Sequence, residues 1–365
     1  MSSTPVPDQP FGRPPLRTVQ VFGDTDADSA GHVRSLAGGL AARGVRVTVC
    51  APVAAEGAHD FTGAGVRFAP ASVAALRAAC AGADLVHAHG TAAAGRAALA
   101  VRGLRLPLVV TWHGEPEDTG PWRHLTRVIE RRVARAAAVV LGGSAHQVDR
   151  ARERGARDAR LAPAGLPADP ATPTRDPDKT RAELGVTGRP LILSVGGPEP
   201  HRDHHLLLDA ARAWRALDPT PLVLVVGEGP RRQGLARRIE TEGLPVRLLG
   251  RRPDLPDLLA AADLAVQPEN SPARSLPAQA ALRAGVPLVA AGDGAMPELV
   301  GTAALLVPHG DAHALADAVT DLLADPARRT ALAAAGRAQA ETWPTEDDTV
   351  AQVLAVYDEL VERRR

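Results

Sequence analysis

Short apolar runs alternate with alanine-rich segments of helical periodicity along nearly the whole chain. The runs have the length and composition of strands, and glycines such as Gly44 and Gly285 stop the helical segments between them. Such an alternation predicts an α/β fold with parallel, doubly wound sheets. The predicted strands lie at 18–22, 45–50, 66–68, 85–87, 108–111 and 138–141, and then at 191–196, 222–226, 246–248, 264–267, 288–290 and 304–307.

The alternation is interrupted between residues 163 and 189, where prolines and charged residues accumulate. A chain of 365 residues is long enough for two α/β domains of ordinary size, so we place the domain boundary in this stretch. We expect a disordered lead over 1–16, a Rossmann-like domain over 17–170, a linker over 171–189, a second Rossmann-like domain over 190–342 and a C-terminal helix over 343–365.

The composition excludes several classes of protein. Lysine plus arginine and aspartate plus glutamate number 42 each, which argues against a nucleic-acid-binding domain, because such domains carry a basic excess. Cys50 and Cys80 are too few for a disulfide framework and are expected to be small buried residues. Residues 1–15 lack the apolar stretch of a signal peptide, and no run approaches about 18 apolar residues. We therefore expect a soluble cytoplasmic protein, with peripheral membrane contact left open.

Several segments match one known family in order and spacing. Residues 31–49 read GHVRSLAGGLAARGVRVTV, and DLVHAHG follows at 84–90. In the second half, AGVP at 284–287 precedes GAMPELV at 294–300. These segments resemble the retaining glycosyltransferases of family 4, which have the GT-B fold, and the resemblance covers about residues 17–362.

The resemblance implies two Rossmann-like domains with an interdomain cleft, the first on the acceptor side and the second binding a nucleotide-sugar. It also implies a last helix that packs back on the first domain. The expected reaction moves a sugar from a nucleoside-diphosphate donor to an acceptor with retention of configuration. In this family the departing phosphate is thought to take the acceptor proton, so a dedicated protein base is not required. No metal or other cofactor is expected. The acceptor is left open between a saccharide, a lipid-linked molecule and a small molecule.

The chain departs from the family pattern at three donor-site positions. Two glutamates, which contact the donor sugar and the nucleotide ribose, align with Pro272 and Ala280, and a diphosphate-binding arginine aligns with Gly197. A diphosphate-binding lysine aligns with Arg202, which is either a replacement ligand with a fork of N–H donors or a solvated charge at a helix start. Losing one cation should weaken donor binding and slow departure of the nucleotide. We therefore expect a degenerate donor site.

Other matching residues keep the family pattern. Gly227 and Gly229 in GEGP follow a predicted strand, where a backbone without Cβ atoms can approach a nucleotide, although an ordinary tight turn has the same sequence. His113 ends a strand where family members keep a histidine that faces sugar and phosphate, and it is the candidate catalytic residue. Gly31 and His32 are placed similarly and are assigned to donor binding.

The loop before the AGVP segment offers further candidates. Glu269 lies three residues before the first lost glutamate and can replace it as a sugar ligand if the loop is rebuilt. Ser275 and Leu276, at the start of the next helix, are also assigned to donor binding. His87 and His89 flank a strand end, and one of them is expected to pack inward. No segment has the ligand spacing of a zinc site, so no metal site is predicted.

Three functions compete on these observations. The first is an active, slow or specialised retaining glycosyltransferase, and the second is a catalytically degenerate GT-B protein that acts as a binding or scaffold module. The third is another GT-B enzyme such as an epimerase or a phosphorylase. The lost arginine and glutamates favour the scaffold, whereas the preserved histidines and glycine turn favour the enzyme, which we place first.

Overall fold

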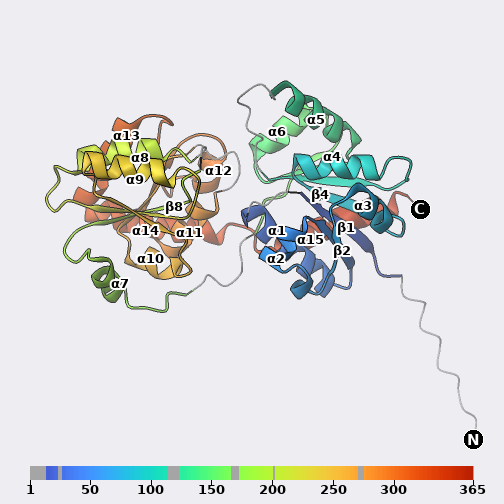
Figure 1. Ribbon diagram of the computed structural model, residues 1–365, viewed down its shortest axis with the longest axis horizontal. Helices are drawn as coiled ribbons and strands as arrows, with labels where there is room; N and C mark the ends of the chain where they lie inside the picture. The colour runs from blue at the N-terminus through green and yellow to red at the C-terminus, as the bar shows by residue number, and fades with distance from the viewer. Residues whose placement is uncertain are drawn as a thin grey trace, which may run out of the picture. The chain divides into compact units, whose positions relative to one another are not determined.

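The computed structural model describes residues 14–23, 27–113, 123–165, 172–199, 202–269 and 275–364. The chain divides into two compact units (Figure 1). Unit 1 comprises residues 1–141, 151–160 and 350–365, and unit 2 comprises residues 142–150 and 161–349. Each unit is built on its own sheet flanked by helices, as the alternation predicts.

Unit 1 contains a sheet with the strand order β3-β2-β1-β4-β5-β6-β7. The chain first runs outward from β1 to β3 and then crosses back to β4, so the order reverses between β1 and β4, which pair in parallel. Its strands are β1 (Arg17–Phe22), β2 (Arg46–Ala51), β3 (Arg67–Pro70), β4 (Leu85–His89), β5 (Leu108–Trp112), β6 (Val139–Gly142) and β7 (Ala159–Leu161). Its helices are α1 (Ala27–Ala42), α2 (Val53–His59), α3 (Val73–Cys80), α4 (Thr91–Ala100) and α5 (Arg123–Ala136), together with most of α15 (Glu346–Glu362); α6 (Ala145–Glu153) lies at the boundary of the units.

The last helix, α15, completes the core of unit 1. Its buried side chains recur every three or four residues, so they form one face of the helix. Gly39 on α1 allows the close approach of the two helices, because a Cβ atom there would lie 2.5 Å from Val350 Cγ2. The buried residues of α15 are Val350, Val353, Val356, Tyr357 and Leu360.

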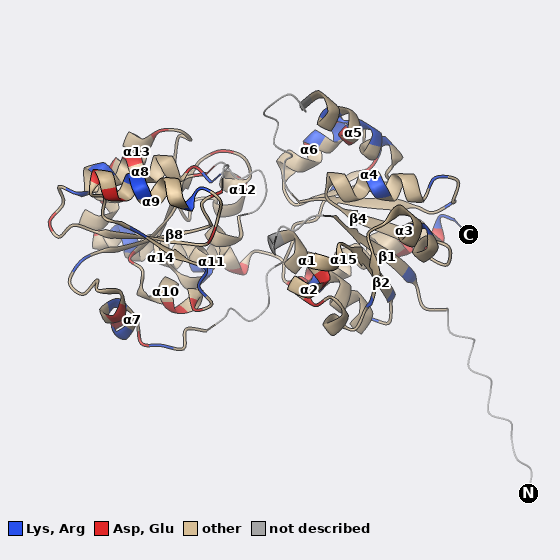
Figure 2. Cartoon of the chain, viewed as in Figure 1, with Lys and Arg blue, Asp and Glu red and all other residues tan. Residues whose placement is uncertain are grey.

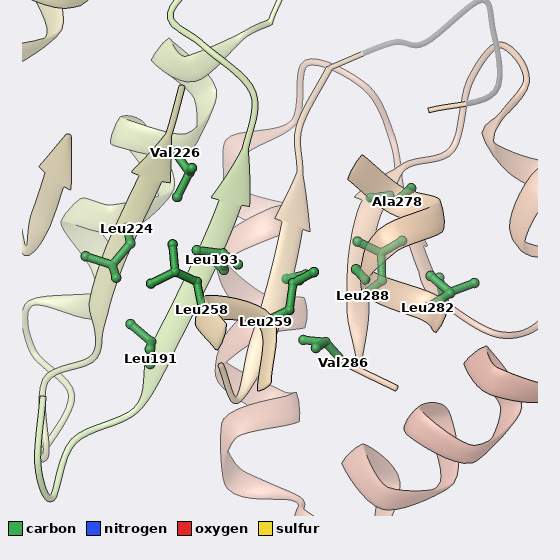
Figure 3. Packing of buried hydrophobic residues seen from close by; sticks show 14 of the residues in the cluster. Leu191, Leu193, Leu224, Val226, Leu258, Leu259, Ala278, Leu282, Val286 and Leu288 are labelled. Carbon is green, nitrogen blue, oxygen red and sulfur yellow. The ribbon is translucent and has the colours of Figure 1, made fainter. Parts of the chain in front are cut away.

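Unit 2 contains a sheet with the order β10-β9-β8-β11-β12-β13, which reverses between β8 and β11 in the same way. Apolar side chains pack on both faces of this sheet, and Figure 3 shows one of the two clusters, with Leu193 and Leu288 from strands beside Leu258 and Leu282 from helices. Its strands are β8 (Leu191–Val195), β9 (Leu222–Val226), β10 (Val246–Gly250), β11 (Leu264–Gln267), β12 (Leu288–Ala291) and β13 (Leu305–Val307). Its helices are α7 (Pro177–Leu184), α8 (His204–Trp214), α9 (Arg232–Glu242), α10 (Leu255–Ala261), α11 (Leu276–Ala284), α12 (Met296–Val300), α13 (Ala312–Ala324) and α14 (Pro326–Glu341).

Two segments differ from the sequence expectation. Part of the expected linker, 171–189, forms α7, which Asp176 caps at its N-terminus and Gly185 ends in a left-handed conformation. Leu184 of this helix belongs to the core of unit 2. A short strand that the sequence did not predict, β7, lies at Ala159–Leu161 at the edge of the unit 1 sheet.

Candidate functional site

The two sheets share one topological feature that positions their polar residues. In a doubly wound sheet, ligands bind at the carboxyl ends of the strands where the strand order reverses. This point lies between β1 and β4 in unit 1 and between β8 and β11 in unit 2. Buried polar side chains gather at both points, and we describe each unit by itself.

In unit 1, a chain of hydrogen bonds joins five buried side chains. Gln20 on β1 donates from Nε2 to the Tyr357 hydroxyl over 2.9 Å. That hydroxyl lies 2.6 Å from His87 Nδ1, and His87 Nε2 lies 2.7 Å from Thr111 Oγ1. His89 Nε2 lies 2.9 Å from Gln20 Oε1. The helix α15 therefore supplies the hydroxyl that links the side chains of β1 and β4.

Two further histidines lie beside these hydrogen-bonded side chains at the end of the sheet. His113, directly after β5, approaches His89 with 3.1 Å between His113 Nε2 and His89 Nδ1. His32 on α1 lies against both rings, with centroids 5.1 Å from His113 and 6.0 Å from His89. The ligating nitrogens of His32, His89 and His113 all lie within 4.8 Å of one another. The structure therefore brings the sequence candidates His32 and His113 together.

Burial keeps these imidazoles neutral. It lowers the pKa of His32 to about 4 and the pKa of His87 to about 3, and it lowers the pKa of His89 and of His113 well below the ordinary 6.5. A neutral ring has one N–H and one lone pair, so each hydrogen bond assigns a tautomer. With Gln20 Oε1 accepting from His89 Nε2–H, His89 Nδ1 accepts from His113 Nε2–H.

In unit 2, glycines allow two strand-end loops to pack backbone against backbone. A Cβ atom on Gly197 would lie 1.9 Å from the carbonyl oxygen of Glu228, and one on Gly227 would lie 2.4 Å from the Gly197 nitrogen. A Cβ atom on Gly229 would lie 2.6 Å from the carbonyl carbon of Pro198. The glycines of the GEGP turn thus serve this loop–loop packing. The family's arginine cannot occupy position 197 unless the loops separate.

Arg202 and Glu269 form an ion pair at the reversal point of unit 2. Arg202 Nη1 donates to Glu269 Oε1 over 2.9 Å. Glu269 is 4% exposed, and this burial raises its pKa although the Arg202 charge acts in the opposite direction. Both residues were assigned to the donor from the sequence, and the structure pairs them with each other. His204 Nε2 lies 3.2 Å from the carbonyl oxygen of Gly196, beneath the Arg202 side chain.

Several buried polar atoms around this edge have no hydrogen-bond partner among the described residues. Gln267, at the end of β11, uses Nε2 to bond the Val195 carbonyl, but its Oε1 is unpartnered. Both side-chain amide atoms of Gln279, in the first turn of α11, are unpartnered and buried. Arg202 Nε is also unpartnered. Buried polar groups in native proteins are usually paired, so these atoms are candidates for contacts with a polar ligand.

The remaining candidates have structural roles or lie apart. Ser275 caps α11, because its Oγ accepts from the Ala278 N–H over 3.3 Å, and Leu276 is the first residue of that helix. Ala280 is partly buried against the unit 2 core. Gly31 is exposed on α1. Pro272 lies outside the described residues.

Other residues of these sites were missed or misplaced by the sequence reasoning. We expected one of His87 and His89 to pack inward, but both are buried, at 0% and 2% exposure, because residues i and i+2 share one face of a strand. Gln20 and Gln267 were available as signals, since Gln20 interrupts the apolar end of β1 and Gln267 ends the otherwise apolar β11. Tyr357, from the far end of the chain, had no such local signal.

Two parts of the chain match models of known protein families. Residues 29–166 match the model of the glycosyl transferase 4-like domain, and residues 176–339 match the model of glycosyl transferases group 1. A D-inositol 3-phosphate glycosyltransferase of Xylanimonas cellulosilytica is 30% identical over 314 residues, which are 77% of this chain and 73% of that protein.

A second relative carries a more specific description. The GDP-mannose-dependent monoacylated alpha-(1-6)-phosphatidylinositol monomannoside mannosyltransferase of Corynebacterium glutamicum is 34% identical over 200 residues. The matched stretch covers 51% of this chain and 52% of that protein, so the chain spans about half the length of this relative.

Solved structures share the fold. HepE of Anabaena, solved with UDP, aligns with a TM-score of 0.81 at 21% identity and covers 94% of this chain and 100% of its own. Sucrose-phosphate synthase of Thermosynechococcus elongatus aligns with a TM-score of 0.79 at 21% identity, over 96% of this chain and 100% of its own. Within the described residues, no helix combines the length and apolar character needed to cross a membrane.

Proposed function

Because this chain belongs to the family 4-like, group 1 glycosyltransferases with the GT-B fold, we propose that it uses a nucleoside-diphosphate sugar as donor and retains the configuration of the transferred sugar. The observation that carries this proposal is the reversal point of unit 2. There a partly exposed guanidinium and a buried carboxylate form an ion pair after β8 and β11, and amide atoms at the end of β11 and in the first turn of α11 have no partner among the described residues. An anion and a polyhydroxylated sugar both match such a set of groups.

Arg202 can serve the donor diphosphate without releasing Glu269. Its guanidinium has five N–H donors on three nitrogens. Nη1 donates to Glu269, and Nε has no partner among the described residues. Charge-assisted bonds from this fork would strengthen as the leaving nucleotide gains negative charge. Glu269 would then hold Arg202 in position and offer its second oxygen to a sugar hydroxyl.

The changes at the family's ligand positions favour slow or specialised turnover. Position 197 has no room for a side chain, and Ala280 packs against the core where the family has a ribose-binding glutamate. We propose that Gln267, Gln279 and Glu269 supply replacement contacts to the donor. The leaving phosphate would accept the acceptor proton, so the transfer would need no dedicated protein base, and Arg202 would supply positive charge to the diphosphate in place of a metal. In unit 1, His113 would hydrogen-bond a sugar hydroxyl or a phosphate oxygen, as its family position implies.

Calorimetry with UDP, GDP and ADP tests donor binding. We expect one of the three nucleotides to bind saturably and Arg202→Gln to weaken that binding by about 10- to 100-fold, since a charge-assisted bond contributes roughly 1.5–3 kcal/mol. Arg237→Gln, a change at an exposed arginine of α9, is the matched control and should leave affinity unchanged. If no nucleotide binds at millimolar concentration, the proposal fails.

Turnover is tested separately with the matching nucleotide-sugar. NMR of the first-formed product should show the anomeric configuration of the donor. Inversion would overturn the retaining mechanism. Saturable nucleotide binding without transfer or donor hydrolysis would instead assign the chain to the binding or scaffold function.

We further propose that the acceptor is presented at an anionic membrane surface. The relative from Corynebacterium glutamicum is named for a phosphatidylinositol-based acceptor. In this chain, α5 contains five arginines and one glutamate, and it stands out in the charge distribution of unit 1 (Figure 2). Its exposed face combines Leu125 and Val128, at 51% and 44% exposure, with Arg131, Arg132 and Arg135. Basic charge beside exposed apolar side chains is typical of helices that lie at membrane surfaces.

Sedimentation with vesicles tests this surface. Vesicles that contain phosphatidylglycerol should bind the protein, pure phosphatidylcholine vesicles should not, and added salt should weaken the binding. The double change Leu125→Asp and Val128→Asp should abolish it. Val53→Asp, at an exposed apolar position of α2, is the matched control. Equal binding to both kinds of vesicle, or binding to neither, would contradict a membrane-presented acceptor.

A further inference from the structure

Three histidine side chains lie close together at the end of the unit 1 sheet. His32 comes from α1, His89 from the last position of β4, and His113 from the residue after β5. Their ligating nitrogens lie within 4.8 Å of one another, and His89 Nδ1 lies 3.1 Å from His113 Nε2. We propose that His32, His89 and His113 form a binding site for one zinc ion.

The distances between the three histidines are close to those of a tetrahedral zinc site. Zinc–imidazole bonds of about 2.0–2.1 Å in a tetrahedron place the nitrogens about 3.3 Å apart. His89 and His113 already have this spacing, but both rings must turn so that their lone pairs face the ion instead of each other. The His32 nitrogen, which lies within 4.8 Å of theirs, must move by up to about 1.5 Å. His32 is partly exposed and makes no hydrogen bond among the described residues, so its side chain can make this movement at low cost.

A second layer of contacts already orients the central ligand. His89 Nε2 is hydrogen-bonded to Gln20 Oε1, which holds the proton on that nitrogen and turns the Nδ1 lone pair toward His113. Metal-binding histidines characteristically donate their other N–H to such an oxygen, which fixes both the tautomer and the ring orientation. Gln20 is fixed in turn by Tyr357. The site therefore has both a set of ligands and the support that such ligands need.

The chemistry of the three groups selects the ion. Neutral imidazole is a good ligand for zinc and for neighbouring transition metals, whereas magnesium and calcium prefer oxygen ligands. Burial keeps all three rings neutral near pH 7, so their lone pairs need not first lose a proton. Three protein ligands leave the fourth tetrahedral position for water or a substrate oxygen. Zinc would replace the hydrogen bond between His113 and His89, and the His113 proton would move from Nε2 to Nδ1 by exchange with water.

The test is metal binding to the full chain, which does not depend on the proposed transferase activity. After removal of metals with EDTA, titration with Zn²⁺ followed by calorimetry should show one ion bound per chain. Titration with Co²⁺ should give the intense visible bands of a tetrahedral cobalt centre, and Zn²⁺ should displace them.

Variants assign the ligands. His32→Ala should weaken zinc binding at least about tenfold, because even the loss of an outer hydrogen-bond partner typically costs 10–100-fold in metal affinity. His205→Ala, an exposed histidine of α8, is the matched control and should bind zinc as the parent does. Circular dichroism should show that His32→Ala is folded, and His32→Gln provides a second variant if it is not.

Two results would overturn the proposal. One is the absence of stoichiometric Zn²⁺ binding at micromolar concentration. The other is equal zinc affinity in the parent and in a folded His32 variant, which would place the ion elsewhere. In either case the three histidines serve only the hydrogen-bond network of unit 1.

Discussion

At the scale of single residues, the pair of Arg202 and Glu269 is asymmetric. The Glu269 side chain is 5% exposed and the Arg202 side chain 21%, so removing the arginine leaves a carboxylate that water hardly reaches. Breaking a buried pair in this way costs about 3–5 kcal/mol. We expect Arg202→Gln to lower the free energy of unfolding by about 3 kcal/mol at pH 7.5, and by less at pH 5, where Glu269 is more readily protonated.

The reverse change should cost less. Glu269→Gln leaves a guanidinium with access to water, and we expect a loss of about 1 kcal/mol. Urea denaturation of both variants and the parent at the two pH values measures the difference. Equal losses for the two variants, or a loss for Arg202→Gln that is larger at pH 5, would contradict this account of the pair.

A second single residue, His204, is expected to make the free energy of unfolding depend on pH. Burial lowers its pKa from 6.5 to about 4, and its buried Nδ1 has no hydrogen-bond partner among the described residues. The unfolded chain takes up this proton below pH 6.5, whereas the folded chain resists it until about pH 4. The contribution to stability is therefore complete above pH 6.5 and falls by up to about 3 kcal/mol as the pH drops to 4.

The measurement compares urea denaturation at pH 7 and pH 4.5. His204→Asn keeps an N–H donor for the Gly196 carbonyl but cannot titrate, so it should lose about 2–3 kcal/mol less than the parent between these pH values. His205→Asn, at the exposed neighbouring position, should follow the parent. An identical pH dependence in the parent and His204→Asn would show that His204 is not the group responsible.

At the scale of elements, the loops after β8 and β9 depend on glycine. Gly197→Ala places a Cβ atom 1.9 Å from a backbone oxygen that cannot rotate away, so the loops must separate. Overpacking of this kind costs about 1–3 kcal/mol. Gly234→Ala is the control, because that exposed glycine of α9 has nothing within 4 Å of a Cβ and should gain about 0.5–1 kcal/mol. Thermal unfolding of both variants tests the contrast, and a neutral Gly197→Ala would contradict the packing role.

The same loops show how far sequence reasoning reaches. The twelve predicted strands and the doubly wound arrangement follow from local periodicity, and the structure confirms them, whereas β7 was not predicted. The glycines at 227 and 229 were interpreted as room for a nucleotide, whereas the contacts that require them are with the neighbouring loop. The chain of Gln20, Tyr357 and His87 joins residues more than 250 positions apart, and no local pattern encodes such a meeting. The grouping of His32, His89 and His113 could not be predicted either, because these residues are also far apart in the sequence.

At the scale of the whole molecule, each unit has its own core, but unit 1 is built from residues that come both before and after unit 2 in the sequence. Unit 2 contains residues 161–349, while the residues that follow return to unit 1. Unit 1 therefore depends on the last helix, α15, for part of its core and for the Tyr357 hydroxyl at its polar edge. We therefore expect that residues 1–160 alone do not complete the folding of unit 1.

This dependence leads to a prediction for a chain that ends after Thr349. The deletion removes five buried side chains of α15, each of which stabilises by roughly 1.5–3 kcal/mol, so the total loss is on the order of 10 kcal/mol. That loss is comparable to the entire stability of an ordinary domain, about 5–15 kcal/mol. Hydrogen exchange read by mass spectrometry should show β1 and β4 without protection, while β8 and β9 remain protected. A chain that ends after Glu362 is the control and should keep protection in both sheets, because it retains all of α15. Protected β1 and β4 in the shorter chain would mean that unit 1 folds without this helix.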